Sequence, residues 1–544
     1  MTLITGMLLL ASSPVVSQPY NWDFAESLAG STSGSGLVKM DQDYAGNIYV
    51  CGEFTDTRTF GPYTLTATGN KDIFVAKYDN TGMCQWAIHG GGLNTTVNSG
   101  GIVIHNGIIY ITGSFNGSLH LSNLTVSTNP PNTQVYIALI DPSNGMVNVL
   151  KQEGGNFDDF ATGICKSASG GFYITGSFAG VANFGSYSVN SGNFSNTDVF
   201  IAKYNAFGNC LWVKKGGSLA QEDKGLAVKE MPDGNVVLTG YFQGAAYFDT
   251  WWMIGNAGAD IFLVCYNSAG AVQWATHGGS AGTDLPTAIT TDSLDYVYVT
   301  GEIGAGGTFS SIYVPGDGYG TAFIAKYDST GNCQWVKTAE SFGSDIGSEL
   351  VTDPGGNSYM VGDISGNANF SGTQLNGAMG FDGFVSKYDP AGNLIWVIRL
   401  ANPGLNDIRS VLLQSNGALI LSGEFENTMS LGNFTIQPSP PGTPTLFLTL
   451  LSPGTLGLNE PSAATFSIAP NPASDWLYVV GEGTTLYTKS EIIGIDGKVI
   501  QTAYNHAFEN GTFDIPINTL AAGSYFLRLS GDSGTAVKRF HVIR

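Results

Sequence analysis

The sequence predicts an all-β protein, a seven-bladed β-propeller closed by an N-terminal strand and followed by a small Ig-like β-sandwich. Two observations predict the propeller: a short β-branched and aromatic run ending in glycine recurs seven times, 61 to 64 residues apart, and the repeat shows no helical period. Such a regular period indicates one supersecondary unit stacked on copies of itself. The seven glycines are Gly52, Gly113, Gly176, Gly240, Gly301, Gly362 and Gly423.

Each period contains four runs typical of strands. In the third copy they read ATGICKS (161–167), FYITGSF (172–178), DVFIAKYN (198–205) and CLWVKKGG (210–217). A D/N-x-x-G step before the last run predicts a tight hairpin, because Asp or Asn bonds its own backbone and Gly supplies positive φ. Between the second and third runs, two apolar residues five positions apart, such as Phe184 and Val189, predict a small flap packed on its own blade.

The outermost strand determines how the ring closes. It is marked by Trp86, Val147, Trp212, Trp274, Trp335 and Trp396 in six copies, but the seventh copy ends at LFLTLLSPG (446–454). A similar strand, NWDFAESLAG (21–30), stands instead before the first copy. We predict that it completes blade seven and removes an open sheet edge, so that residues 18–454 form one ring.

Composition favours an extracellular protein. Charged residues make up only 12% of the chain, and 74 of its 544 residues are glycine. The net charge of −21 disfavours nucleic acid and anionic membrane surfaces as partners, and we expect a monomer with no transmembrane segment. Cys84, Cys210 and Cys333 occupy the same place in three blades, too far apart to bridge, so we interpret the six cysteines as buried thiols.

The two ends of the chain differ from the repeats. Residues 1–17, MTLITGMLLLASSPVVS, are typical of a signal peptide, although a basic n-region is missing. Residues 455–463 form a predicted linker. Residues 464–544 alternate strands with turns such as Asp496-Gly497, which predicts the small β-sandwich.

Short motifs in this last segment resemble the type A sorting domain of the type IX secretion system of Bacteroidetes. The resemblance implies export across the outer membrane, the type IX machinery as partner, and a secreted or outer cell-surface location. The matching residues are Pro470, Asn471, Pro472, Gly497, Lys498, Gly523 and Tyr525, with the basic end Lys538-Arg539.

The upstream repeats, from about 20 to 452, resemble the SBBP β-propeller repeat, whose units read much like GNVYVTG…DAFVAKYDxxGxxxW. That family offers no catalytic motif to transfer to this chain.

Three strings resemble catalytic motifs, and each has a simpler interpretation. Gly278–Gly282 fits G-x-S-x-G and Gly531–Gly534 fits GDSG, but both stand where turns are predicted and neither has His and Asp partners around it. Asp79–Trp86 resembles the tryptophan-docking motif of quinoprotein propellers, which have eight blades. We interpret it as a turn followed by a Trp that locks adjacent blades.

Two features exceed what strand geometry requires. A ring of acids stands before the innermost strands, and it either caps each strand entry or holds a cation, such as calcium, or a polar ligand at the channel mouth. In blade four, Met253 fills the regular apolar place of the flap, so Trp252 beside Trp251 should point to solvent or to a neighbouring blade. The ring consists of Asp159, Asp223, Asp284, Asp345 and Asp407.

These features favour a surface or secreted binding protein for a glycan or another protein, without a required cofactor. The alternative is an extracellular enzyme, polysaccharide-active or quinoprotein-like, with its site at the channel mouth. An enzyme would need carboxylates with shifted pKa values converging on a substrate.

Overall fold

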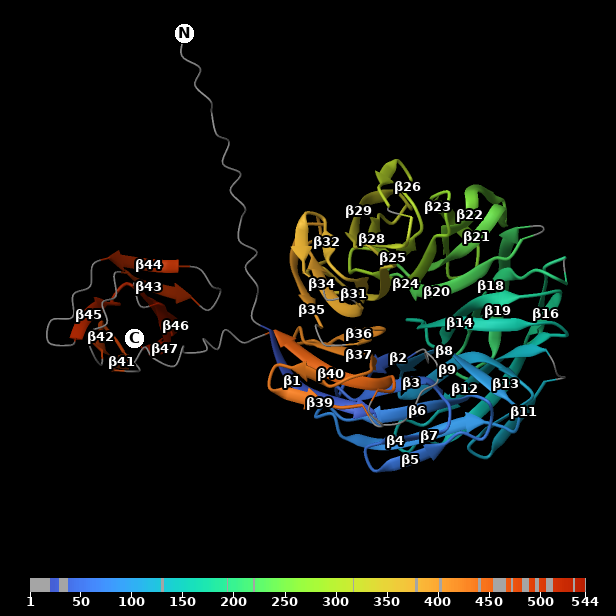
Figure 1. The fold of residues 1–544 in the computed structure, drawn as a ribbon, viewed down its shortest axis with the longest axis horizontal. Helices are drawn as coiled ribbons and strands as arrows, with labels where there is room; N and C mark the ends of the chain where they lie inside the picture. The colour runs from blue at the N-terminus through green and yellow to red at the C-terminus, as the bar shows by residue number, and fades with distance from the viewer. Residues whose placement is uncertain are drawn as a thin grey trace, which may run out of the picture. The chain divides into compact units, whose positions relative to one another are not determined.

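The computed structural model describes residues 20–28, 38–128, 132–192, 194–218, 221–316, 318–376, 380–400, 404–438, 442–453, 466–470, 473–481, 489–494, 499–504, 512–531 and 534–543. The predicted signal peptide and the predicted linker lie outside these residues. The chain divides into two compact units, Met1–Ser452 and Pro453–Arg544. Every regular element described in either unit is a β-strand, so the chain is all-β (Figure 1).

In the N-terminal unit the described strands form seven four-stranded antiparallel repeats, which we number along the chain. The innermost strands are β2 (Lys39–Gln42), β8 (Thr96–His105), β14 (Asp159–Lys166), β20 (Lys224–Glu230), β24 (Leu285–Thr291), β30 (Ile346–Thr352) and β36 (Ser410–Leu413). The second strands are β3 (Ile48–Phe54), β9 (Ile108–Asn116), β15 (Phe172–Phe178), β21 (Val236–Phe248), β25 (Val297–Ile303), β31 (Ser358–Ser365) and β37 (Leu419–Phe425).

The third strands are β6 (Asp72–Tyr78), β12 (Thr133–Ile140), β18 (Asp198–Tyr204), β22 (Trp251–Tyr266), β28 (Thr321–Tyr327), β34 (Phe381–Tyr388) and β40 (Thr445–Pro453). The outermost strands are β7 (Cys84–Gly91), β13 (Val147–Gly155), β19 (Cys210–Ser218), β23 (Val272–Gly279), β29 (Cys333–Glu340), β35 (Leu394–Arg399) and, for repeat 7, β1 (Tyr20–Leu28).

The innermost strands contact one another in a cycle. Each of β2, β8, β14, β20, β24, β30 and β36 contacts the next, and β36 contacts β2. Figure 1 shows the sheets of this unit arranged around a common centre, with these strands nearest to it.

The recurring glycine is required by a bulge in the innermost strand. A Cβ on Gly301 would lie 2.0 Å from the carbonyl oxygen of Leu285, and one on Gly176 would lie 1.8 Å from that of Phe160. The register shifts directly afterwards, between Pro286 and Ala288 in repeat 5. The bulge pushes the backbone of the inner strand against the second strand, so only glycine fits.

The short hairpin between the second and third strands joins neighbouring repeats. Its first strand pairs with the outermost strand of the preceding repeat, as where Asn183 lies opposite Gly154. The expectation that the flap packs only on its own blade was therefore incomplete. The separate hairpins are β4 (Thr57–Phe60) with β5 (Tyr63–Thr66), β10 (Ser118–Leu121) with β11 (Leu124–Ser127), β16 (Val181–Phe184) with β17 (Tyr187–Asn190), β26 (Gly307–Phe309) with β27 (Ile312–Val314), β32 (Ala368–Phe370) with β33 (Thr373–Leu375), and β38 (Met429–Leu431) with β39 (Phe434–Ile436). In repeat 4 the end of β21 and the start of β22 form it.

The tryptophans of the outermost strands also join neighbouring repeats. The indole Nε1 of Trp274 donates to the carbonyl oxygen of Ser329, 2.8 Å away in the tight turn of the next repeat. Gly331 of that turn packs on the ring, where a Cβ would lie 2.7 Å from it. Trp86, Trp212 and Trp335 make the same bond to Pro142, Ser268 and Pro390.

β1 takes the outermost place of repeat 7 and pairs with β40. The Thr449 hydroxyl donates to the carbonyl oxygen of Phe24 at 2.6 Å. Phe24 packs against Gly82 of repeat 1, as the tryptophans pack against the equivalent glycines. At the other side of repeat 7, the rings of Tyr20 and Trp396 lie 4.6 Å apart.

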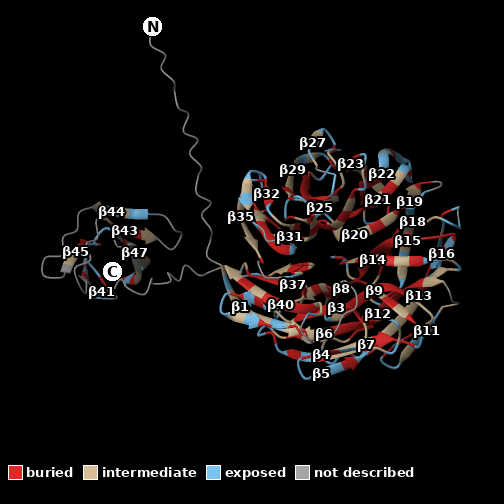
Figure 2. Ribbon diagram, in the orientation of Figure 1, coloured by how far each residue is buried: buried red, intermediate tan, exposed pale blue. Residues whose placement is uncertain are grey.

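Apolar side chains fill the space between neighbouring repeats, and Figure 2 shows burial concentrated on the inner strands. Every residue of β15, β18 and β28 is buried. All six cysteines are free, and each is buried or half-buried. Burial raises the pKa of the Cys51 thiol to about 12, so it is an unreactive apolar filler.

The C-terminal unit consists of two antiparallel sheets around one apolar core, which includes Leu477, Ile492, Leu527 and Phe540. The first sheet contains β41 (Phe466–Ala469), β42 (Trp476–Gly481) and β45 (Thr512–Pro516). The second contains β44 (Val499–Tyr504), β43 (Lys489–Gly494), β46 (Gly523–Gly531) and β47 (Gly534–Val542).

Candidate functional site

Four of the five acids of the predicted ring lie at the start of an innermost strand, with their side chains fully buried at the junction with the preceding repeat. Asp345 accepts hydrogen bonds from the backbone N–H of Ser341 at 2.6 Å and of Ser365 at 2.8 Å. Ser341 follows the outermost strand of repeat 5, and Ser365 ends the second strand of repeat 6. The carboxylate therefore ties two repeats together. Asp159, Asp223 and Asp284 lie at the same place and accept equivalent bonds from Gly155, Ser218 and Ser280.

Asp407 does not occupy the equivalent position. Asn406 bridges to Phe425 as Asp159 pairs with Phe178, so Asn406 takes the place of the ring acid in repeat 7. The sequence alignment was wrong by one residue here, because repeat 7 has one residue fewer between this position and its glycine. Asp407 instead pairs with Arg409 at 2.6 Å.

A second set of buried acids at the start of the third strands was missed in the sequence. Asp72, Asp198, Asp260 and Asp382 are all at most 5% exposed. The signal was present as Asp before the recurring apolar run of that strand, but an acid at a strand entry resembles an ordinary solvated cap.

The two sets meet beneath the Gly-Gly pair that ends each outermost strand. The point where a Cβ on Gly217 would lie is 2.8 Å from Asp223 Oδ2 and 3.2 Å from Asp198 Oδ1. The corresponding point on Gly279 is 2.4 Å from Asp260 Oδ1 and 2.8 Å from Asp284 Oδ2. These junctions thus hold buried carboxylate pairs that only glycine can cover.

Burial and mutual repulsion shift the titration of these pairs. Burial raises the pKa of Asp198 to about 7, with Asp223 adding to the rise and Lys215 opposing it. Burial also raises the pKa of Asp223 to about 6 and of Asp260 to about 6. Taking a carboxylate out of water disfavours its charged form, and a second carboxylate disfavours it further.

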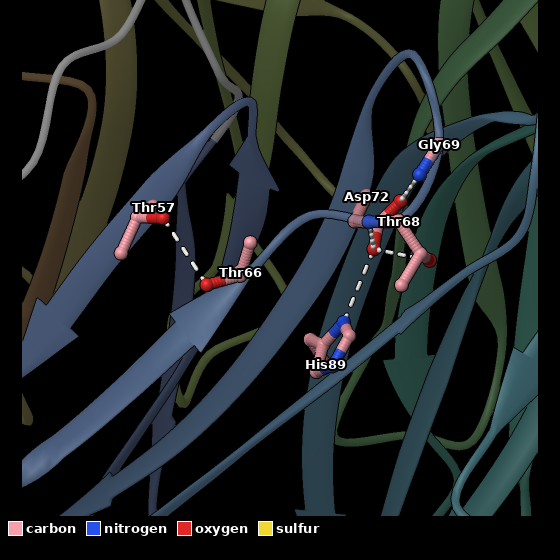
Figure 3. A network of polar contacts seen from close by, with 6 residues as sticks. All are labelled: Thr57, Thr66, Thr68, Gly69, Asp72 and His89. Atoms are coloured by element: carbon pink, nitrogen blue, oxygen red, sulfur yellow. Dashed lines mark hydrogen bonds and ion pairs between the residues drawn. The ribbon is translucent and has the colours of Figure 1, made fainter.

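Asp72 shows that the partners decide the direction of the shift. Burial acts to raise the pKa of Asp72, but hydrogen bonds from His89, Thr68 and Gly69 outweigh it and lower the pKa. Figure 3 shows these donors around the carboxylate, with His89 Nδ1 at 3.1 Å and the Gly69 N–H at 3.0 Å. Junctions built on the same position of the repeat therefore differ in protonation.

The acids that follow the repeat glycine connect to the next repeat. Glu53 accepts a hydrogen bond from the backbone N–H of Ser99 at 2.8 Å, and Asp363 accepts one from Ile408 at 3.0 Å. Glu424 pairs with Arg409 at 3.2 Å. These three side chains thus hold structure at the junctions.

Ion pairs also connect repeats that are not neighbours. Lys39 on β2 lies 2.6 Å from Glu349 on β30, and Lys166 on β14 lies 3.5 Å from Asp41 on β2. These side chains reach across the centre of the cycle of inner strands.

Trp251 and Trp252 lie on the hairpin of repeat 4. Trp252 is 61% exposed and stands directly opposite Tyr247, which is 47% exposed. Ile254, two residues on and on the same face, is also exposed, whereas Phe248 and Met253 on the other face are buried. Trp251 lies at the hairpin tip opposite Phe248 and is 41% exposed. We call Tyr247, Trp252 and Ile254 the aromatic ridge.

A polar pocket of about 440 Å³ lies one repeat earlier on the rim, where β16 of repeat 3 pairs with β13 of repeat 2. Sequence reasoning missed it, because its walls come from two repeats. It is lined by Gln134, Gln152, Glu153, Gly154, Gly155, Asn156, Val181, Asn183 and Gly185.

No group of three or more His, Cys, Asp or Glu side chains within the described ranges is placed to hold a metal ion. Calcium at the acidic ring thus stays a prediction from the sequence.

The comparisons with known proteins address the C-terminal unit most directly. The family model "Secretion system C-terminal sorting domain" matches residues 467–543. The chain is a secreted or outer cell-surface protein. The match implies interaction of this sorting domain with the type IX secretion machinery. No helix in the described part of the chain is long and apolar enough to cross a membrane.

Within the sorting domain, the Tyr525 hydroxyl donates to the carbonyl oxygen of Ala521 at 2.9 Å, and its ring lies 5.8 Å from that of Phe540. Gly523 pairs opposite Val542, and Pro470 follows β41. The other predicted motif residues, Asn471, Pro472, Gly497 and Lys498, lie outside the described residues.

The repeats have one curated relative among the matches, an uncharacterized WD repeat-containing protein of Acanthamoeba polyphaga mimivirus. It is 24% identical over 450 residues, which cover 68% of this chain and 32% of the relative. The chain thus spans about a third of that protein's length.

Solved structures resemble the chain only weakly. The extracellular domain of the putative hybrid two component system BT4673 from B. thetaiotaomicron is 10% identical, with a TM-score of 0.17 over 95% of this chain and 100% of that one. The V. cholerae biofilm matrix protein Bap1 is 11% identical, with a TM-score of 0.20 over 96% of this chain and 83% of that one. Scores this low carry no argument about fold or function.

Proposed function

We propose that the N-terminal unit is a seven-bladed β-propeller, closed by β1, that serves outside the cell as a binding platform for a glycan or a protein. The sorting domain accounts for its delivery, and the aromatic ridge provides its contact surface.

Three contacts support the propeller. The innermost strands contact one another in a cycle, the tryptophans of the outermost strands bond to the next repeat, and β1 pairs with the last strand of the unit. A ring of this kind is a rigid support whose surface hairpins can vary without loss of the core.

The aromatic ridge is the observation that carries the binding role. At the position of Trp252, the equivalent hairpins of repeats 1 to 3 hold Thr64, Thr125 and Ser188, all on the same outward face. Repeat 4 places Trp252 there, opposite Tyr247, although neither side chain is needed to fill the core. Exposed aromatic side chains with a polar tip are the groups that bind sugar faces and protein partners most strongly.

The buried carboxylates favour binding over the enzyme alternative. The groups with raised pKa, Asp198, Asp223 and Asp260, are at most 5% exposed and cover the seams between repeats. Near the centre, Glu349 is already paired with Lys39. A general acid must instead reach its substrate.

The test is binding by the secreted full chain and its Tyr247→Ala, Trp252→Ala double variant, measured on a glycan array and against proteins of the producing cell surface. We expect the variant to lose at least tenfold in affinity with an unchanged melting temperature. Thr64→Ala, at the matching place in repeat 1, is the control and should bind normally. Equal binding by the double variant would refute the role of the ridge.

A further inference from the structure

We propose that the polar pocket between repeats 2 and 3 binds one residue of a neutral, polyhydroxylated saccharide. The inference deepens the proposed function and rests on it, because it names the ligand class for the same rim of the molecule. The pocket belongs to the hairpin of repeat 3, and the aromatic ridge belongs to the hairpin of repeat 4, so the two lie at consecutive junctions.

The pocket offers hydrogen-bonding groups of both kinds. Gln152, Asn156 and Asn183 are exposed, and each side-chain amide can donate and accept. Sugar hydroxyls also donate and accept, so amides match them better than charged groups of one sign. A volume of about 440 Å³ lies within the range of small-molecule sites.

The floor of the pocket is buried and fixed. Gln134 is 3% exposed, and its Nε2 donates to the carbonyl oxygens of Thr133 and Phe157 at 2.9 and 2.8 Å. Glu153 is 8% exposed, and its Oε2 accepts from the backbone N–H of Gly185 at 2.7 Å. These bonds hold both side chains in place before any ligand arrives, which lowers the entropy cost of binding.

Asp159 lies directly beneath this floor. Its Oδ2 and the Oε1 of Gln134 lie 2.4 and 2.6 Å from the point where a Cβ on Gly154 would stand. Its other oxygen, Oδ1, is buried and has no hydrogen-bond partner in the described part of the protein. A buried acceptor of this kind favours a ligand or water that brings a donor to it.

The charge of the pocket selects against anions. Glu153 is part of the lining and Asp159 lies below it, while no lysine or arginine is among the lining residues that the structure describes. A phosphate or a uronic acid would meet repulsion here. A neutral hexose or an N-acetylated sugar would not.

An apolar platform stands beside the pocket. The rings of Phe157 and Phe194 are stacked with centroids 4.9 Å apart, and Phe194 is 63% exposed. Both rings contact Gly180, the neighbour of the wall residue Val181, and Phe157 follows the wall residue Asn156. A ring face next to hydrogen-bonding amides suits a sugar, which has an apolar C–H face and a polar edge.

Affinity electrophoresis tests the inference with the secreted full chain. The gels contain β-1,3-glucan, xylan, α-mannan or galactan, with chitin oligosaccharides as soluble competitors and alginate as the anionic comparison. We expect retardation by at least one neutral polymer and none by alginate. Absence of retardation or competition in every neutral case, or retardation by alginate alone, would overturn the inference.

The variants locate the binding. Gln152→Ala with Asn183→Ala should weaken retardation at least tenfold, as measured by the polymer concentration for half-retardation, and Phe194→Ala should weaken it about threefold or more. These side chains are exposed, so the melting temperature should not change. Asn369→Ala, at the position of repeat 6 that matches Asn183, is the control. Full retardation of the double variant would exclude the pocket.

The arms separate this inference from the proposed function. If the chain binds a protein through Tyr247 and Trp252 but no neutral polymer, the saccharide pocket is wrong and the platform survives. If neutral polymers bind and only the ridge variant loses them, the pocket is again wrong.

Discussion

At the scale of single residues, the glycines and buried acids of the junctions explain each other. Each outermost strand ends in glycine where the acids of two repeats converge, and a Cβ on Gly217 or Gly279 would stand 2.4–2.8 Å from a carboxylate oxygen. The recurring Gly-Gly is therefore a space requirement and not a flexible linker.

The buried pairs predict an unusual dependence of stability on pH. Burial raises the pKa of Asp198 to about 7 and of Asp223 to about 6, both above the value near 3.8 in the unfolded chain. Their contribution to the free energy of unfolding is thus fully present below pH 3.8 and is lost as pH rises through 6 to 7. We expect the melting temperature to fall by several degrees between pH 5 and pH 8, because a tenfold difference in acid dissociation between the folded and unfolded chain corresponds to about 1.4 kcal/mol.

The Asp198→Asn, Asp223→Asn variant checks this prediction by thermal melting across the same range. The neutral amides should flatten the fall. Asp328→Asn is the control, because hydrogen bonds from Asn332 and Thr330 outweigh burial and lower the pKa of Asp328, so it titrates below this window. A slope that both variants leave unchanged would show that Asp198 and Asp223 are charged throughout.

At the scale of the element, the repeat is specified by bulges that sequence periodicity only partly reveals. The seven glycines, the four strands and the hairpin pattern all follow from alternation and turn residues. The displacement of Asp407 does not, because a one-residue change around a bulge moves the equivalent position to Asn406. The acids of the third strands and the pocket were missed for a related reason, since their neighbours lie about 60 residues away and belong to another repeat.

The bulge predicts the cost of filling the glycine position. Gly301→Ala would place a methyl group 2.0 Å from the carbonyl oxygen of Leu285, in backbone that a side-chain rotation cannot move. We expect a loss of about 1–3 kcal/mol or more in the free energy of unfolding, by analogy with overpacked cores. Denaturant melts measure it, with Gly523→Ala as control, because a Cβ there meets nothing closer than 3.7 Å. Equal, small effects for both variants would contradict the tight fit.

At the scale of the whole molecule, closure depends on the N-terminal strand. β1 donates its edge to β40, places Phe24 on Gly82 of repeat 1 and places Tyr20 on Trp396 of repeat 6. One strand therefore connects the last repeat to both of its neighbours.

Deleting residues 18–30 should consequently open the ring. The exposed edge of β40 and the uncovered apolar faces should lower the melting temperature markedly or cause aggregation, as scanning calorimetry and light scattering would detect. Thr449→Ala, which removes only the hydroxyl bond to Phe24, should lower it by a few degrees at most. A deletion variant that melts like the intact chain would rule out the clasp.

Hydrogen exchange of the secreted full chain, with and without a saturating neutral oligosaccharide, tests most directly the claim that a rigid ring binds through its rim. We predict slower exchange at residues 181–190 and 245–256, with no change in the matching hairpins β32/β33 and β38/β39. Slower exchange in the inner strands around Lys39 and Glu349 instead, or no local change at all, would contradict a binding platform on the rim.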